Sequence, residues 1–403
     1  MKKTYKSIYI AFIFIIVFFQ NIVVYADDFS IEAEAGLIVE TNTGKVIFNQ
    51  DAENQKYPAS VTKILTAIIV IENCDLNDKA TVTASAVSNI PDGYVVAPLM
   101  IGEEMRIEDL LYALMLKSSN DAAYVLAEHV GGSIDGFSDM MNKKAVEIGC
   151  KNTHFVNPNG IHDDNHYTTA YDMYLISNYA MKNETFRKIV STYEYTLPAT
   201  NEYSLADRVM ENTNYFLDPD SMYYNEIVKG IKTGTTTEAG NCLITASSKD
   251  GLDFITVVLG AETNYSRFSE TEKMIDYAYE NYTLTKLHDK DEVITNIEVD
   301  KATKDTKNLD LVISDEIIVM NNKSITVDQM SPEIKLNDDI TAPITAGDEI
   351  GTIIYNVDGL QYNAKLLAAN DVEKKTYYIE ISIAVGVAFV IIIIFVKLKK
   401  RRR

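Results

Sequence analysis

The sequence predicts an α/β (α+β) protein: an antiparallel sheet covered by helices, then a small all-β domain and a C-terminal transmembrane helix. Three observations predict this arrangement. Strand-like segments flank a long run of helical patterns, short alternating segments follow from about residue 290, and a continuous apolar run lies near the C-terminus. Strands on both sides of a helical region indicate one sheet that is built from distant segments and covered by helices.

The first region, residues 27–285, begins with a hairpin pattern. In AGLIVETNTGKVIFNQ, residues 35–50, two short apolar stretches surround an Asn-Thr-Gly turn. Thr169 is expected to cap a helix, with Asp172 as its capping-box partner. The helices expected from periodicity are 60–72, 106–116, 121–130, 136–148, 170–181 and 269–282, and the expected strands are 226–233, 241–247 and 254–261.

The second region, residues 292–371, has no helical period. Segments such as DLVISDEIIVM, SITVDQM and EIGTIIYNV alternate apolar and polar residues and are separated by Asn, Asp and Gly turns. This pattern predicts a small β-sandwich domain, followed by a short linker.

Both chain ends carry apolar runs. Residues 1–26 combine the basic start MKKTYK, an apolar stretch and a small residue at position 26, which is typical of a signal peptide; the alternative is an uncleaved anchor. Residues 377–396 are long and apolar enough to cross a bilayer, although a buried core helix has similar composition. The basic tail KLKKRRR, residues 397–403, predicts a cytoplasmic C-terminus and an outward-facing body.

The net charge and the cysteine content argue against a nucleic-acid partner, a disulfide framework and a cysteine zinc site. The formal net charge is −21, and without the nine cationic residues of 1–26 and 397–403, 28 Lys and Arg face 58 Asp and Glu, a net charge of −30. Such a surface repels nucleic acid, so no nucleic-acid partner is expected. The three cysteines, Cys74, Cys150 and Cys242, form no complete disulfide framework and fit no zinc spacing, so each is expected to be a buried free thiol.

Ser60-Val-Thr-Lys63 places a serine and a lysine one helical turn apart. A serine hydroxyl needs a neighbouring base to become a nucleophile, and a lysine amine serves when burial or a second cation lowers its pKa. A free backbone N–H at a helix start can also stabilise an oxyanion. Taken alone, the pattern is better explained by a capped amphipathic helix with a surface lysine.

Two further triplets change this interpretation. Ser118-Ser119-Asn120 lies between two helical segments, and Lys232-Thr233-Gly234 lies at the end of a strand pattern. Each alone is an ordinary turn. All three together, at a helix start, an interhelix loop and a strand end, predict one site.

With these motifs the sequence resembles the serine D-alanyl-D-alanine carboxypeptidases, the low-molecular-mass penicillin-binding proteins related to serine β-lactamases. The blocks IEDLLYALMLKSSNDAAYVLAEHVGGS, HFVNPNGIHDDNHYTTAYDM and KTGTTTEAGNCL carry the resemblance, and APITAGDEIGTIIYNVDG is similar to the β domain that follows the family's catalytic domain. The similarity covers about residues 30–370.

The resemblance implies specific catalytic roles. Ser60 would attack the carbonyl of the D-Ala-D-Ala bond and Lys63 would remove its proton. Ser118 would relay a proton to the departing amine, and Asn120 would orient Lys63 and the substrate amide. The backbone N–H groups of Ser60 and Thr235 would form the oxyanion hole.

The resemblance also implies substrate-binding roles. Lys232 would keep the site cationic, and Thr233 would bind the terminal carboxylate. Gly234 would allow the substrate backbone to lie close to the strand. Arg267 is a candidate second carboxylate ligand, and a solvated surface arginine is the alternative.

The implied function is a membrane-anchored serine DD-carboxypeptidase. It would remove the terminal D-alanine of peptidoglycan stem pentapeptides through an acyl-enzyme and would be acylated by β-lactams, which mimic the dipeptide. No cofactor or metal is expected. One departure from the family pattern is IPDGYVVAPLMIG, residues 90–102, which is bulkier than expected at the rim of the site and is expected to affect access or β-lactam sensitivity.

Three alternatives remain open at this point. A β-lactamase shares the motifs, but no Glu-containing deacylation loop is recognisable between Asn120 and Lys232. A non-catalytic wall-binding protein would keep the fold with a degenerate site. A zinc enzyme could use His162 and His166, although H-E-x-x-H is absent.

Overall fold

The structure is a computed structural model and describes residues 29–376 and 378–400. The predicted signal peptide, 1–26, and the last three residues of the basic tail lie outside the described residues. The chain divides into two units after Glu32, and the fold described below is that of the unit that begins at Ala33.

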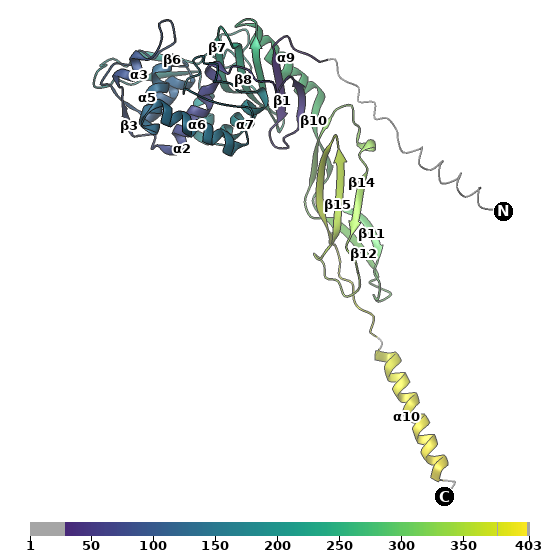
Figure 1. The fold of residues 1–403 in the computed structure, drawn as a ribbon. Helices are drawn as coiled ribbons and strands as arrows, with labels where there is room; N and C mark the ends of the chain where they lie inside the picture. Colours follow the sequence, from purple (N-terminus) through teal and green to yellow (C-terminus); the bar gives the residue numbers. More distant parts are fainter. Residues whose placement is uncertain (1–28, 377, 401–403) are drawn as a thin grey trace, which may run out of the picture. The chain divides into compact units, whose positions relative to one another are not determined.

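A five-stranded antiparallel sheet forms the first domain, in the order β2-β1-β9-β8-β7 (Figure 1). Its strands are β1 (Ala35–Glu40), β2 (Val46–Gln50), β7 (Val228–Thr236), β8 (Gly240–Lys249) and β9 (Leu252–Ala261). The predicted hairpin is confirmed, and β1 pairs with β9, with Ala35 opposite Leu259. The sheet therefore joins segments that lie more than 200 residues apart in the sequence, as predicted.

Helices cover both faces of this sheet. Adjacent side chains of β8 point to opposite faces, and Ile244 packs in the large cluster that contains α2, whereas Leu243 packs with Phe268 and Ile275 of α9. The helices are η2 (Ala59–Thr62), α2 (Lys63–Asn73), α3 (Ala84–Ser88), α4 (Ile107–Met115), α5 (Asn120–Gly131), α6 (Ile134–Ile148), α7 (Ala170–Met181), α8 (Glu184–Val190) and α9 (Ser266–Asn281). Since all eight residues from Lys63 to Val70 are buried, α2 is the central helix of this domain.

Two local predictions are wrong in detail. The predicted helix 60–72 begins with a 3₁₀ turn, η2, and Ser60 lies inside that turn without capping α2 through its side chain. Thr169 does cap α7, because its hydroxyl accepts a hydrogen bond from the Asp172 N–H (3.0 Å). The Asp172 carboxylate, however, accepts hydrogen bonds from the segment 151–153 rather than completing a capping box.

Two short pairs of antiparallel strands were not predicted. β3 (Lys79–Thr81) pairs with β4 (Glu104–Arg106), and β5 (Glu194–Leu197) pairs with β6 (Arg208–Glu211). Strands of three or four residues are too short to establish an alternating pattern.

The second domain is all-β, as predicted. Its five-stranded sheet has the order β11-β12-β16-β15-β14, and β10 pairs with β13. The elements are β10 (Tyr282–His288), β11 (Val293–Glu298), β12 (Asn308–Ile313), β13 (Ile317–Asn322), η3 (Val327–Gln329), β14 (Pro332–Leu336), β15 (Glu349–Val357) and β16 (Leu360–Ala368). The predicted boundary at residue 285 falls within β10.

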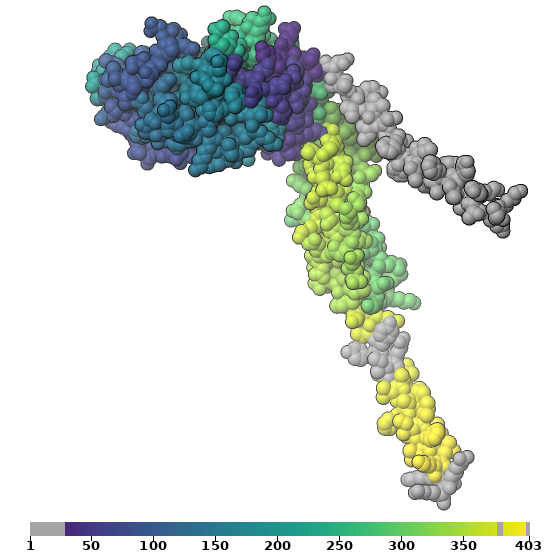
Figure 2. Space-filling view, viewed as in Figure 1, coloured from purple at the N-terminus to yellow at the C-terminus, as the bar shows by residue number. Residues whose placement is uncertain are grey.

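The C-terminal helix α10 spans Tyr378–Lys400. Its apolar window, Ser382–Lys399, drawn in yellow at the C-terminal end in Figure 2, is long enough to cross a membrane, and none of the window is buried. The absence of burial in this window argues against the alternative of a buried core helix. The helix is the candidate membrane anchor.

The three cysteines are free thiols. Cys242 is buried as predicted, but Cys74 and Cys150 are only partly buried, so the prediction of full burial is wrong for these two.

Candidate active site

Ser60 lies in a backbone turn that is wedged between two glycines. Ala59, just before it, has a left-handed φ of 47°, which is unfavourable for a residue with a side chain and persists only where the surroundings enforce it. A Cβ at Gly160 would lie 1.8 Å from the Ala59 carbonyl oxygen, and a Cβ at Gly234 would lie 2.9 Å from the Ser60 nitrogen. Gly234 therefore allows strand β7 to lie directly against the turn that carries Ser60.

The Lys63 amine lies at the centre of the site. Its Nζ is 2.9 Å from Ser60 Oγ, 3.0 Å from Asn120 Oδ1 and 2.7 Å from the Asn159 carbonyl oxygen. Burial, and next the positive charge of Lys232, hold the pKa of Lys63 well below its ordinary value. A neutral amine has two N–H groups, which match the two carbonyl oxygens. Its lone pair is then left for the Ser60 hydroxyl proton.

Ser118 and Asn120 lie at the junction between α4 and α5. Ser118 has a left-handed φ of 64° and lines the cavity beside Ser60. Asn120 begins α5, and both its backbone N–H and its Nδ2 donate hydrogen bonds to the Val95 carbonyl oxygen, each at 2.9 Å. Its Oδ1 is thereby directed toward Lys63.

Lys232 and Thr233 are buried on β7. Burial, and then the charge of Arg267, lower the pKa of Lys232 to about 7, and its Nζ has no hydrogen-bond partner in the described chain. The Thr233 hydroxyl oxygen lies 2.6 Å from that of Thr213. The strand end thus contains a cation that titrates near neutrality and an oriented threonine hydroxyl.

Arg267 is buried in α9, with 5% of its surface exposed, so the alternative of a solvated arginine is wrong. Its Nη1 donates to the Gly234 carbonyl (3.1 Å) and to Thr235 Oγ1 (3.0 Å). Burial lowers its pKa to about 10. Arg267 supports the strand end from behind, and direct binding of a carboxylate remains a prediction.

A cavity of about 510 Å³ is lined by residues of the first two motifs and by the residues that follow Gly234 on β7. It is lined by Ser60, Asp92, Gly93, Tyr94, Val95, Ser118, Asn120, Asn159, Gly160, Ile161, Thr235, Thr236 and Thr237. Four predicted site residues therefore face one space, whereas Lys63, Lys232, Thr233 and Arg267 are buried around it. A larger cavity of about 870 Å³, lined by residues of α7, α8, β8 and β9, contains none of the motif residues.

Sequence reasoning missed three contributors. The Asn159 carbonyl contacts Lys63, and Gly160 admits the Ser60 turn; both belong to the NPNG block, whose Pro-Asn-Gly run marks a tight turn. Thr213, the partner of Thr233, lies in a loop without any recognisable pattern.

The two histidines of the zinc alternative have other partners. His166 is buried, and burial lowers its pKa to about 3, so the ring is neutral. Its Nδ1 accepts the Val156 N–H (3.2 Å), which leaves Nε2 to donate to Thr62 Oγ1 (2.9 Å). His162 packs edge-on against Tyr57. Among the described residues, no group of three His, Cys, Asp or Glu side chains is placed to hold a metal.

A serine hydroxyl in contact with a buried lysine amine, beside the open edge of an antiparallel sheet, is an arrangement typical of serine hydrolases that act through an acyl-enzyme. A family model described as D-alanyl-D-alanine carboxypeptidase matches residues 22–263, and one described as the C-terminal domain of penicillin-binding protein 5 matches residues 282–374. The chain belongs to the D-alanyl-D-alanine carboxypeptidase family and is a serine-type enzyme, as predicted.

Individual relatives and solved structures support this family assignment. The D-alanyl-D-alanine carboxypeptidase DacF of Bacillus subtilis is 33% identical over 353 residues, which cover 86% of this chain and 87% of the relative. The crystal structure of penicillin-binding protein 5 from Haemophilus influenzae, 27% identical, superposes with a TM-score of 0.65 over 86% of this chain and 99% of that one. The Streptomyces K15 DD-transpeptidase structure, 31% identical, covers 63% of this chain and 99% of its own, with a TM-score of 0.59.

Proposed function

We propose that Ser60, with Lys63 as its base, releases the terminal D-alanine from peptidoglycan stem peptides that end in D-Ala-D-Ala. The observation that carries the proposal is the environment of the Lys63 amine. Two carbonyl oxygens occupy its two N–H groups, and the third direction points to Ser60 Oγ at 2.9 Å. A buried amine in these contacts is suited to accept a proton from Ser60.

In the acylation step, Ser60 Oγ attacks the carbonyl carbon of the scissile amide while its proton passes to Lys63 Nζ. The resulting oxyanion is held by the backbone N–H groups of Ser60 and Thr235. The close contact of Gly234 with the Ser60 turn, which brings β7 beside the nucleophile, supports this oxyanion hole.

In the next step, the C–N bond breaks and the departing D-alanine nitrogen takes a proton, relayed by Ser118 from Lys63. The remaining peptide is then an ester on Ser60. Water attacks the ester carbonyl and gives a proton to Lys63, which passes it to Ser60 Oγ as the ester C–O bond breaks. Asn120 keeps Lys63 oriented throughout, since its Oδ1 is fixed by the bond from its Nδ2 to Val95.

The strand end would bind the terminal carboxylate. The Thr233 hydroxyl and the Thr235 hydroxyl are each held by a neighbour, Thr213 and Arg267 respectively. The Lys232 and Arg267 charges make this end of the cavity positive. A carboxylate is the ligand that such hydroxyls and cations favour.

β-Lactams would enter as mimics of the D-Ala-D-Ala unit. Ser60 would open the lactam amide and form the same type of ester, and the bound ring fragment would slow hydrolysis. Penicillin therefore acts as a covalent inhibitor in this proposal.

The domain that carries the site would face the cell wall. The apolar window of α10 is followed by a basic tail, which favours a cytoplasmic C-terminus. Protease added outside intact cells should then digest the first two domains and leave the tail protected; a protected catalytic domain would contradict this orientation.

The decisive assay measures free D-alanine released from a stem pentapeptide by the purified protein without residues 1–26. The wild type is expected to release one D-alanine per peptide and to form a covalent adduct with labelled penicillin. Ser60→Ala is expected to do neither while unfolding at the same urea concentration. Penicillin hydrolysis without D-alanine release would support the β-lactamase alternative, and neither activity would support a wall-binding protein.

A further inference from the structure

The bulky segment flagged in the sequence forms part of the cavity wall. Within that segment, residues 92–102, here called the rim segment, contribute four residues, Asp92 to Val95, to the cavity that contains Ser60. Its apolar side chains are unusually exposed, namely Tyr94, Val95, Val96, Met100 and Ile101, with exposed fractions from 36% to 61%. Since few of these side chains are buried, apolar packing does little to hold the segment in place.

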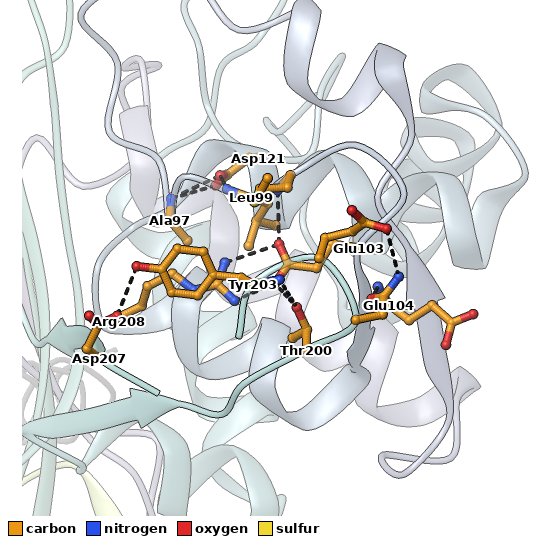
Figure 3. Close-up of polar contacts among 12 residues, drawn as sticks. Ala97, Leu99, Glu103, Glu104, Asp121, Thr200, Tyr203, Asp207 and Arg208 are labelled. Carbon is orange, nitrogen blue, oxygen red and sulfur yellow. Dashed lines mark hydrogen bonds and ion pairs between the residues drawn. The ribbon is translucent and has the colours of Figure 1, made fainter. Parts of the chain in front are cut away.

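One anchor of the rim segment comes from α5. The Asp121 carboxylate accepts hydrogen bonds from the Ala97 N–H (2.9 and 3.0 Å) and the Leu99 N–H (3.1 Å), as Figure 3 shows. Asn120, its neighbour, binds the Val95 carbonyl. The rim segment and the Ser118–Asn120 motif are therefore one hydrogen-bonded unit.

The other anchor is Glu103, whose side chain is fully buried just after the rim segment. Its carboxylate accepts hydrogen bonds from the Met100 N–H (2.9 Å) and from Thr200 Oγ1 (2.7 Å). Arg208 adds a two-pronged ion pair through Nη1 (3.1 Å) and Nη2 (Figure 3). Burial by itself would raise the pKa of Glu103, but the hydrogen bonds from Arg208, Met100 and Thr200 hold that pKa below its ordinary value, so the carboxylate is charged.

Arg208 is the first residue of β6, and its guanidinium is held in place by a neighbouring aromatic ring. It is buried, and its guanidinium lies 4.4 Å from the centre of the Tyr203 ring, whose hydroxyl donates to Asp207 (2.9 Å). A buried ion pair contributes little net stability compared with apolar residues of the same size. What the pair does fix is geometry, because a bidentate arginine fork accepts a carboxylate in one orientation only.

We propose that Glu103 and Arg208 are positioning residues for the reaction. They hold the rim segment so that Tyr94 and Val95 form a rigid apolar wall, and this wall selects the part of the peptide that precedes the D-Ala-D-Ala bond. The inference rests on the proposed function, because it requires the peptide to bind in the cavity that contains Ser60. Neither residue lines the cavity, so both act through the rim segment.

The test compares Glu103→Gln with Arg208→Met and Arg208→Lys. Loss of the pair should raise KM for a stem pentapeptide about tenfold and change kcat less than about threefold, because the wall is displaced while Ser60 and Lys63 keep their contacts. KM for a short blocked peptide that ends in D-Ala-D-Ala should change little. Arg208→Lys keeps the charge that balances Glu103 but loses the bidentate fork, so its ratio of KM values for the two peptides should lie between those of the wild type and Arg208→Met.

Phe137→Leu, in the buried core of α6, is the matched control for general destabilisation. It should lower the urea midpoint without altering the ratio of KM values for the long and short peptides. The proposal is overturned if Glu103→Gln leaves that ratio unchanged, or if Phe137→Leu changes it equally.

Hydrogen exchange keeps the test informative even if the Glu103 variant folds poorly or the wild type releases no D-alanine. Amides of residues 93–102 should exchange at least tenfold faster in Arg208→Met than in Arg208→Lys. Equal exchange in these two variants would refute the positioning role by itself, whereas failure of the proposed function would show as absent D-alanine release and absent penicillin adduct in the wild type.

Discussion

The two domains differ sharply in what they bury. Around Ser60, the first domain buries the cations Lys63, Lys232 and Arg267. In residues 282–376 of the described chain, Asn321 is the one buried polar side chain, and the rest of the core is aliphatic or aromatic. The second domain therefore has an ordinary hydrophobic core, whereas the first domain contains buried cations that such a core lacks.

Burying a charge costs free energy, so these buried cations indicate a chemical role in the site rather than a contribution to stability. Burial and the charge of Lys232 lower the pKa of Lys63, and burial and the charge of Arg267 lower the pKa of Lys232. This arrangement lowers the pKa of Lys63 and so favours the neutral form of its amine, which can accept a proton. The comparison predicts that changes in the first domain alter catalysis and changes in the second alter stability alone.

The largest effect is expected from Lys63. Both Lys63→Met and Lys63→Arg should reduce the rate of acylation by penicillin by about 10³- to 10⁴-fold, because neither side chain can accept the Ser60 proton. Stopped-flow fluorescence with a labelled penicillin measures the rate. If Lys63→Arg is acylated at more than a tenth of the wild-type rate, position 63 supplies a positive charge rather than a base.

Lys232→Met should shift the pH profile. The charge of Lys232 lowers the pKa of Lys63, so removing it raises that pKa, and the acidic limb of the acylation profile should move to higher pH. The rate at pH 7 should fall about 100-fold, while the free energy of unfolding should rise by about 1–4 kcal/mol because a buried cation is lost. Lys232→Arg, which keeps the charge, should leave the acidic limb in place; an equal shift there would contradict the electrostatic explanation.

A smaller effect is expected at Thr213. Thr213→Val removes the hydroxyl that lies 2.6 Å from Thr233 Oγ1 and should reduce kcat/KM for the pentapeptide about fivefold, the value of one ordinary hydrogen bond. Thr213→Ser restores the hydroxyl and should restore activity. If the serine variant is as impaired as the valine variant, the methyl group rather than the hydrogen bond supports Thr233.

No catalytic effect is expected in the second domain. Leu309 is fully buried in its core, and Leu309→Ala should reduce the free energy of unfolding of that domain by about 2–5 kcal/mol. Acylation by penicillin at 20 °C should remain within about twofold of the wild type. A parallel loss of acylation would show that the two domains are not independent in function.

Periodicity predicted the elements whose ends carry local signals. Helix α7 begins at Ala170 because the Thr169 side chain caps it, and α5 ends where Gly132 adopts a left-handed conformation. Such caps depend on neighbouring residues only and are therefore readable from the sequence. The three motifs were readable for a similar reason, since each is a short run of residues.

Tertiary contacts account for what was missed. The 3₁₀ turn at Ser60 is imposed by Gly160, in a loop about 100 residues away, and by Gly234, on strand β7 about 170 residues away. The burial of Arg267 follows from its packing behind β7, and Thr213 meets Thr233 only in the folded chain. No pattern within one segment contains this information.

The central claim is that burial and a neighbouring cation make Lys63 a neutral base beside Ser60. It is tested most directly by labelling lysine with ¹³C at Cε and following the Lys63 resonance by NMR as pH is varied. The account predicts a titration midpoint well below the ordinary lysine value, and a higher midpoint in Lys232→Met. A Lys63 signal that titrates at the same pH as surface lysines, in both proteins, would contradict it.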